Sequence, residues 1–158
     1  MGDVETKIKV GSYRQKTGYT CGPAVLKIVL HYFGRNFSEK TILKAAGTTK
    51  KQGTSHEGLV YVLNKLGYKW VQKENATIQN IEFFIKKKLP VIVDYQAWHG
   101  GHYSVICGFD KTHLIVCDPA KDGGFRSINK KLFLKRWHDT GVLRGIKYHQ
   151  WMMVVFPK

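Results

Sequence analysis

The chain has 158 residues, of which 43% are hydrophobic and 13% aromatic, a composition that predicts a folded domain and excludes a disordered chain. Lysine and arginine number 26 against 11 aspartates and glutamates, giving a formal net charge of +15. No run of about eighteen apolar residues is present, and the acidic segment Met1–Glu5 lacks the features of a secretory signal. We therefore expect a single cytoplasmic domain over residues 1–158.

The first half of the chain is predicted to be mainly helical. Residues 7–10 alternate in polarity and predict an edge strand. A buried helix is expected from Pro23 to about Phe33, with Gly34 at its end. Three more helices are expected: one capped by Ser38 and ended by Gly47, one starting at the capping-box pattern Thr54-x-x-Glu57 and ended by Gly67, and one capped by Thr77 with Lys86–Lys88 at its end.

The second half changes to strands. A short helix capped by Asn129 is the exception. Residues 97–101 are expected to form a loop because Gly100 and Gly101 favour irregular backbone. Strands are predicted over 68–72, 90–95, 102–109, 113–118, 125–128 and 150–156. Helices followed by a mostly antiparallel sheet predict an α+β fold.

Cys21 stands at the predicted start of the first buried helix. Unpaired N–H groups and the helix dipole favour a thiolate there, so this is a suitable place for a nucleophile. Gly22 is expected to allow an unusual turn, and Pro23 fits the first helical turn because its missing N–H costs nothing there. The alternative is a small buried cysteine that only packs in the core.

The other cysteines, Cys107 and Cys117, are predicted to be packed core residues. Three cysteines make no disulfide framework, and their odd number suggests a reducing compartment. Neither Cys-x-x-Cys nor His-x-x-x-His spacing is present, so no structural zinc site is expected. The chemistry proposed below requires no metal or cofactor.

A nucleophilic cysteine needs a base and a group that orients the base. If strands 102–109 and 113–118 pair around Asp110, partners sum to 220 and His102 lies directly opposite Asp118, within reach of a hydrogen bond. A one-residue slip of this register would break the pairing. His31, His56, His99 and His113 are the alternatives; we interpret His99 as a candidate substrate contact in a loop and the other three as ordinary polar residues.

Gln15 precedes Cys21 by six residues. Its side-chain amide could donate a hydrogen bond to a developing oxyanion together with the Cys21 backbone N–H. Spacing alone does not separate this role from that of a solvated loop residue.

Three blocks, in this order, resemble the double-glycine cysteine peptidases, the bacteriocin-processing members of the papain-like group. They are Gln15-x5-Cys21-Gly22-Pro23-Ala24, Gly101-His102-Tyr103-x-Val105 and Asp118-Pro119-Ala120. The resemblance covers nearly the whole chain. It implies a papain-like fold with a helical half and a sheet half. It also implies Cys21 as nucleophile, His102 as general base and acid, Asp118 as its orienting group and Gln15 in the oxyanion hole.

The sequence departs from that family in its architecture. Many members are the N-terminal domain of an export transporter that cuts leader peptides after Gly-Gly. This chain has no membrane helix and no P-loop pattern, so we expect a stand-alone domain and leave the leader-peptide substrate open.

A cysteine peptidase, with cleavage after a Gly-Gly type site as one option, is the function that the sequence favours. A papain-fold transferase that passes the acyl group to an amine or thiol is the first alternative. A catalytically silent module that binds peptide or nucleic acid is the second. The basic residues are scattered in short clusters, which disfavours nucleic acid, so we expect a peptide or protein partner, for which the positive charge permits acidic character.

Overall fold

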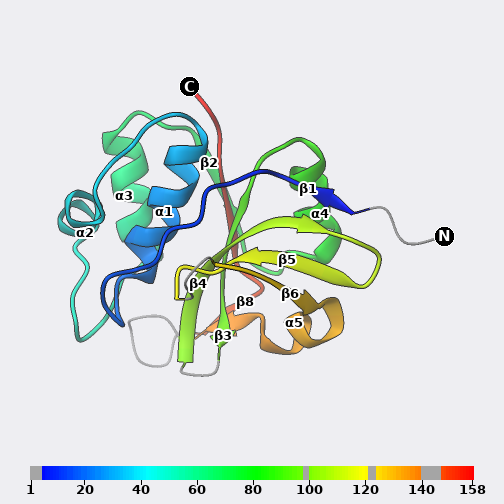
Figure 1. The fold of residues 1–158 in the computed structure, drawn as a ribbon. Coiled ribbons are helices and arrows are strands. Elements are labelled where there is room, and N and C mark those ends of the chain that lie inside the picture. The colour runs from blue at the N-terminus through cyan, green and yellow to red at the C-terminus, as the bar shows by residue number, and fades with distance from the viewer. Residues whose placement is uncertain (1–4, 98–99, 121–123, 140–146) are drawn as a thin grey trace.

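The computed structural model describes residues 5–97, 100–120, 124–139 and 147–158 (Figure 1). Helices α1, α2 and α3 gather on one side of the molecule, and an antiparallel sheet with α4 and α5 forms the other side. Two halves of different secondary structure are therefore packed together, as the order of predicted elements indicated.

The described residues form five helices and nine strands. The helices are α1 (Cys21–Tyr32), α2 (Glu39–Ala46), α3 (His56–Lys65), α4 (Ile78–Lys86) and α5 (Lys130–Arg136). The strands are β1 (Thr6–Lys7), β2 (Trp70–Lys73), β3 (Val91–Ala97), β4 (Gly100–Phe109), β5 (His113–Cys117), β6 (Phe125–Asn129), β7 (His138–Asp139), β8 (Tyr148–His149) and β9 (Met152–Val155).

Seven strands form one antiparallel sheet with the order β2-β9-β3-β4-β5-β6, and β1 pairs with part of β4. The short strands β7 and β8 pair separately, and the sequence pattern did not predict them. Strand β4 begins at Gly100, so Gly100 and Gly101 are strand residues and the expected loop is shorter. Of that loop, Trp98 and His99 lie outside the described residues.

Helix α1 joins the two halves because it packs on β4 on one side and on α2 and α3 on the other. Its apolar residues make this contact, since Ala24, Val25, Leu26, Ile28, Val29 and Leu30 are all buried. At about 25 cal/mol per Å² of apolar surface, such a face is a large part of the stabilisation of the fold. The position of Cys21 at the first residue of α1 is thereby fixed against the sheet.

Local signals placed the helix ends well. Ser38 accepts a hydrogen bond from Thr41 N and Gly47 closes α2 in the left-handed conformation, as predicted. Thr77 and Asn80 form a capping box at α4. The predicted capping box at Thr54 is wrong, because Ser55 caps α3 by accepting from Gly58 N. The Thr54 hydroxyl instead bonds to the hydroxyl of Thr48 at 2.7 Å.

Gly22 serves close packing and not an unusual turn. It is the second residue of α1 and its φ is not positive. A Cβ at this position would lie 2.6 Å from both Cβ and Oγ1 of Thr54, which is closer than van der Waals contact permits. The absence of a side chain lets the start of α1 approach the loop before α3.

The variant Gly22→Ala is therefore expected to lower the free energy of unfolding by about 1–3 kcal/mol, the usual cost of overpacking. The higher helix propensity of alanine, about 1 kcal/mol, offsets part of this cost. Urea unfolding measures the change. Gly18→Ala is the matched control because nothing lies within 4 Å of its added Cβ. Equal stability of the two variants would contradict the packing argument.

Among the described residues, no helix combines the length and the apolar character needed to cross a membrane.

Candidate active site

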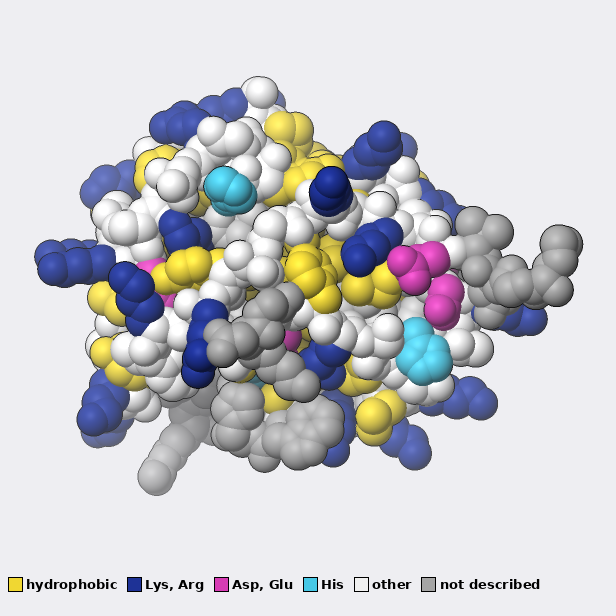
Figure 2. All heavy atoms as spheres, in the orientation of Figure 1, with side chains coloured by type: hydrophobic (Ala, Val, Ile, Leu, Met, Phe, Trp, Pro, Cys, Tyr) yellow, Lys and Arg dark blue, Asp and Glu magenta, His cyan; other side chains and the backbone are white. Residues whose placement is uncertain are grey.

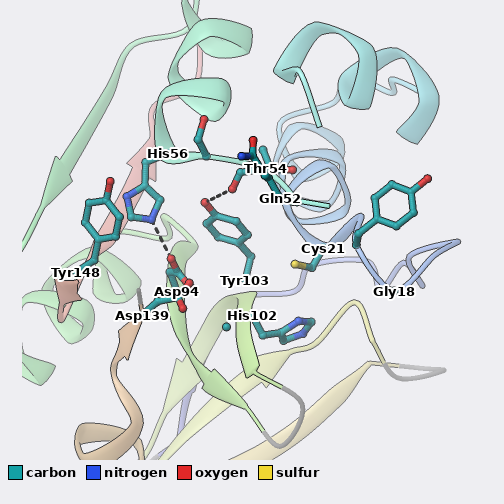
Figure 3. A pocket seen from close by; sticks show the side chains of 14 residues that line it. Gly18, Cys21, Gln52, Thr54, His56, Asp94, His102, Tyr103, Asp139 and Tyr148 are labelled. Carbon is teal, nitrogen blue, oxygen red and sulfur yellow. Dashed lines mark hydrogen bonds and ion pairs between the residues drawn. The ribbon is translucent and has the colours of Figure 1, made fainter. Parts of the chain in front are cut away.

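A pocket of about 300 Å³ lies where the start of α1 meets β3 and β4 (Figure 3). Cys21 lines it from the helical half, and His102 and Tyr103 line it from the sheet half. The remaining lining residues are Gly18, Tyr19, Gln52, Gly53, Thr54, Ser55, His56, Asp94, Gly101, Asp139 and Tyr148. The cysteine and histidine singled out by the sequence therefore share one cavity.

Cys21 is the first residue of α1 and is half-buried. The Thr20 side chain before it makes no capping bond and accepts instead from Thr17 N at 3.2 Å, which shapes the preceding turn. The thiol consequently sits among N–H groups at the positive end of the helix dipole. Figure 3 shows its sulfur pointing into the pocket.

His102 and Asp118 form a buried hydrogen bond of 2.8 Å between Nε2 and Oδ1. The predicted register is wrong, however: Phe109 pairs with Leu114, and after a bulge near Cys107 the pair is Val105 with Cys117. The residue numbers of paired residues thus add up to 223 before the bulge and 222 after it, and not to 220. The shift makes His102 and Asp118 diagonal neighbours on the same face, which are still within reach of each other.

The backbone beyond β5 holds Asp118 in place. Its N–H donates to Gly124 O at 2.6 Å, and its Oδ1 also accepts from Ala120 N at 2.9 Å. The carboxylate therefore has a fixed direction, and Nε2 of His102 faces it. The remaining ring nitrogen, Nδ1, is the one available to Cys21, whose side chain hydrogen-bonds the imidazole.

The pKa values of this pair move in opposite directions. Burial is the largest influence on His102 and lowers its pKa, but hydrogen bonds to Asp118 and Cys21 and the charges of both outweigh it, raising the pKa to about 9. Burial would raise the pKa of Asp118, yet its bond to His102 and neighbouring donors lower it to about 2. The imidazolium and the carboxylate are thus both charged at neutral pH.

Arg126 is a site residue that the sequence did not reveal. From β6 its Nε donates to Asp118 Oδ2 at 3.2 Å, and its Nη2 donates to the hydroxyl of Tyr95. Both oxygens of Asp118 are consequently hydrogen-bonded. No local spacing predicts this contact, because it depends on the pairing of β5 with β6.

Gln15 lies in the loop before α1, and its side chain is not part of the pocket lining. Its Nε2 donates to Thr17 O at 2.7 Å, and its buried Oε1 has no hydrogen-bond partner among the described residues. Its backbone N–H donates to Pro119 O at 2.8 Å, which ties this loop to the segment after Asp118. Gln15 therefore lies beside the segment that follows Asp118.

Cys107 and Cys117 are buried strand residues, as expected, and the pairing of Cys117 with Val105 puts Cys117 on the opposite face from His102. Burial raises the pKa of Cys107 to about 11 and that of Cys117 to about 12. His31 is exposed on α1 and His113 lies beside the turn at Asp110. His99 is outside the described residues.

His56 is not an ordinary polar residue. It is buried, its Nε2 lies 2.9 Å from Asp94 Oδ2, and its ring stacks on Trp151 with centroids 3.8 Å apart. Burial lowers the pKa of His56 to about 4, which keeps the ring neutral. Burial also raises the pKa of Asp94 well above its usual value, helped by the neighbouring carboxyl group of Asp139. The pocket thus holds a second His–Asp pair.

Metal ligation has no evident place in the described part of the chain, where no three His, Cys, Asp or Glu side chains form a cluster suited to an ion.

Comparison with known proteins gives a consistent result. The sequence model of the Peptidase C39 family matches residues 9–144. An uncharacterized protein of Methanothermobacter marburgensis is 30% identical over 122 residues, 77% of this chain and 79% of that protein. The lactococcin transport/processing ATP-binding protein LcnC-like of Lactococcus lactis is 31% identical over 127 residues, 77% of this chain but 16% of that protein.

Solved structures show the same fold. The peptidase domain of Streptococcus ComA, a bi-functional ABC transporter, has a TM-score of 0.76 at 22% identity, with 94% of this chain and 98% of that domain covered. A double-glycine-motif protease from an AMS/PCAT transporter, solved with its leader peptide, has a TM-score of 0.73 at 19% identity, with 96% of this chain and 94% of that chain covered. A putative C39-like peptidase from Bacillus anthracis has a TM-score of 0.77 at 15% identity, with 99% of each chain covered. The expected papain-like α+β fold is confirmed.

Proposed function

From the premise that the chain belongs to the Peptidase C39 family and is a cysteine peptidase, we propose that Cys21 is its nucleophile, His102 its general base and acid, and Asp118 the group that orients His102. The observation that carries this proposal is the buried 2.8 Å bond between His102 and Asp118 in the pocket that Cys21 enters from the start of α1. A thiol at a helix start beside a carboxylate-bound imidazole is the arrangement that supports these roles.

In the first half of the reaction, Sγ of Cys21 attacks the carbonyl carbon of the scissile peptide bond. Its proton resides on His102, whose raised pKa of about 9 stabilises the imidazolium. The tetrahedral intermediate collapses, the C–N bond breaks, and the imidazolium gives its proton to the leaving amine. The product is a thioester between Cys21 and the N-terminal part of the substrate.

In the second half, His102 takes a proton from water, which attacks the thioester carbonyl. The C–S bond breaks, a carboxylic acid leaves, and the proton returns to the Cys21–His102 pair. Asp118 stays ionised throughout because its pKa is near 2. Its role is to hold the ring so that Nδ1 faces the sulfur.

The oxyanion of each intermediate needs hydrogen-bond donors. The Cys21 backbone N–H at the start of α1 is one candidate, and we propose the Gln15 amide as the second. One N–H of Gln15 is used by Thr17 O, and the other is the one available for substrate.

Peptides with Gly-Gly before the scissile bond are the substrate class that we propose to test first. The leader-peptide complex of the AMS/PCAT protease and the lactococcin-processing relative support this choice. The small pocket volume also favours residues without bulky side chains next to Cys21. We expect cleavage of a Gly-Gly peptide at least about tenfold faster than of its Val-Val counterpart.

The test is mass spectrometry of peptide products from the purified protein and from the Cys21→Ala variant. Cleavage by the protein but not by the variant is expected, since removal of a nucleophile abolishes covalent catalysis. Added glycinamide separates hydrolysis from acyl transfer through the mass of the product. Cleavage retained in Cys21→Ala would refute the assignment of the nucleophile.

A further inference from the structure

The wall of the pocket across from Cys21 is acidic. Asp94 and Asp139 both line it, and none of the lining residues in the described part of the chain is lysine or arginine. The chain as a whole carries a net charge of +15, and its basic side chains are spread over the surface in Figure 2. The acidic lining of this pocket therefore contrasts with the positive net charge of the whole chain.

Asp94 has an oxygen that calls for a hydrogen-bond donor. The residue is 3% exposed and comes from β3, where it pairs across the sheet with Tyr103. Its Oδ2 bonds to His56 at 2.9 Å, whereas its buried Oδ1 has no hydrogen-bond partner among the described residues. A buried carboxyl oxygen without a partner is costly, so a ligand that brings an N–H donor would be bound favourably.

Asp139 adds a second carboxyl group to the same wall. It comes from β7, and Gln96 Nε2 donates to its Oδ1 at 3.0 Å. A Cβ at Gly101 would overlap both of its carboxylate oxygens, so Asp139 lies directly against the backbone that precedes His102. Figure 3 shows the two aspartates next to each other, across Tyr103 from Cys21. A group bound there would be adjacent to the reacting bond.

We propose that Asp94 and Asp139 form a subsite for a cationic group of the peptide substrate, close to the bond that Cys21 attacks. A guanidinium or ammonium group supplies the N–H donors that Asp94 Oδ1 lacks and the charge that two carboxyls favour. This inference rests on the proposed function of Cys21. The cation can come from an arginine or lysine side chain or from a free peptide N-terminus, and the experiment below separates these sources.

The competing explanation is a single proton shared by the two carboxyl groups. Burial and the neighbouring Asp139 raise the pKa of Asp94, which is the direction that such sharing requires. A pocket whose carboxyls satisfy each other in this way would bind a cation no better than a neutral molecule of the same shape. Matched charged and neutral probes therefore decide between the two.

The experiment measures protection of Cys21 from iodoacetamide by mass spectrometry, with no substrate turnover. N-butylguanidinium is compared with neutral N-butylurea, and glycinamide with N-acetylglycinamide. We expect the cations to protect half of Cys21 at concentrations at least tenfold lower than their neutral counterparts. Preference confined to butylguanidinium indicates a side chain as the source, and preference confined to glycinamide indicates an N-terminus.

Variants identify the residues responsible. Asp139 is half-buried, and Asp139→Asn keeps an acceptor for Gln96. In this variant the ratio of the neutral to the charged probe concentration that protects half of Cys21 should fall below threefold. The same fall is expected in Asp94→Asn. Glu57→Gln is the matched control, because it removes an exposed carboxylate near the pocket that is not among its lining residues. Its ratio should stay within twofold of the unaltered protein.

Equal protection by charged and neutral probes would overturn the subsite, as would a ratio that survives in both aspartate variants. Failure of the proposed function has a different signature. It appears without any probe, as an alkylation rate of Cys21 that His102→Ala leaves unchanged. The ratio of probe concentrations remains measurable in that case, because it needs only that iodoacetamide reaches Cys21.

Discussion

The variant His102→Ala is expected to slow the alkylation of Cys21 by iodoacetamide at pH 6 by about tenfold or more. With a pKa of about 9, His102 is an imidazolium at this pH and stabilises a thiolate beside it. Without the ring, Cys21 loses the positive charge that stabilises its thiolate, and the thiol form reacts poorly with iodoacetamide. Alkylation rates between pH 5 and 10, resolved for each cysteine by mass spectrometry, measure the effect.

Cys107 and Cys117 are internal controls in the same sample. Burial raises their pKa values to about 11 and about 12, so both should remain nearly unreactive at pH 6 in either protein. His31→Ala is the control for loss of an imidazole from an exposed position of α1. Identical pH profiles of Cys21 in the unaltered protein and in His102→Ala would show that no thiolate–imidazolium pair exists.

Short-range signals explain why most of the fold could be predicted. Ser38, Gly47 and Thr77 act on backbone groups within three or four residues, so their roles are visible in the sequence. The Thr54 prediction failed because two neighbouring hydroxyl residues, Thr54 and Ser55, compete for one cap. Packing against Gly22, which is far away in the sequence, and the bond to Thr48 both occupy Thr54, and neither contact is visible in the capping pattern.

The strand register shows a similar limit. A regular hairpin around Asp110 places His102 opposite Asp118, but the bulge near Cys107 shifts the pairing. The bond between the two side chains survives because the shift by two positions preserves the face of the sheet. The predicted partnership was right although the geometry used to derive it was wrong.

The site itself was only partly visible in the sequence. Cys21 begins α1, His102 lies on β4, and Asp118 directly follows the next strand, β5, so local reasoning reached them. Asp94 and His56 are 38 residues apart and meet only because the folded chain brings the first residue of α3 to β3. Arg126 reaches Asp118 only through the pairing of β5 with β6. Contacts of this kind depend on topology, which residue spacing does not contain.

Replacement of Asp118 tests how the charge of the site is set. Asp118→Asn keeps an acceptor for His102 Nε2 but removes the negative charge. Burial, which lowers the pKa of His102, then meets less opposition, so this pKa should fall by about 1–3 units from about 9. The imidazolium is consequently lost at lower pH, and the basic limb of the kcat/KM profile should move in the acid direction by the same amount.

Asp118→Ala removes the hydrogen bond as well, and kcat/KM should fall by about a hundredfold or more because the ring loses its orientation. Asp110→Asn, at the turn of the same hairpin, is the control and should leave the basic limb in place.

The effect of Asp118 on stability has a defined sign. The folded-state pKa of Asp118 is lowered from 3.8 to about 2, so its contribution to the free energy of unfolding is present above about pH 4 and disappears as the pH falls through 2. The stability difference between Asp118→Asn and the unaltered protein should therefore vanish in strong acid. A basic limb that does not move in Asp118→Asn would mean that Cys21, and not Asp118, maintains the charge on His102.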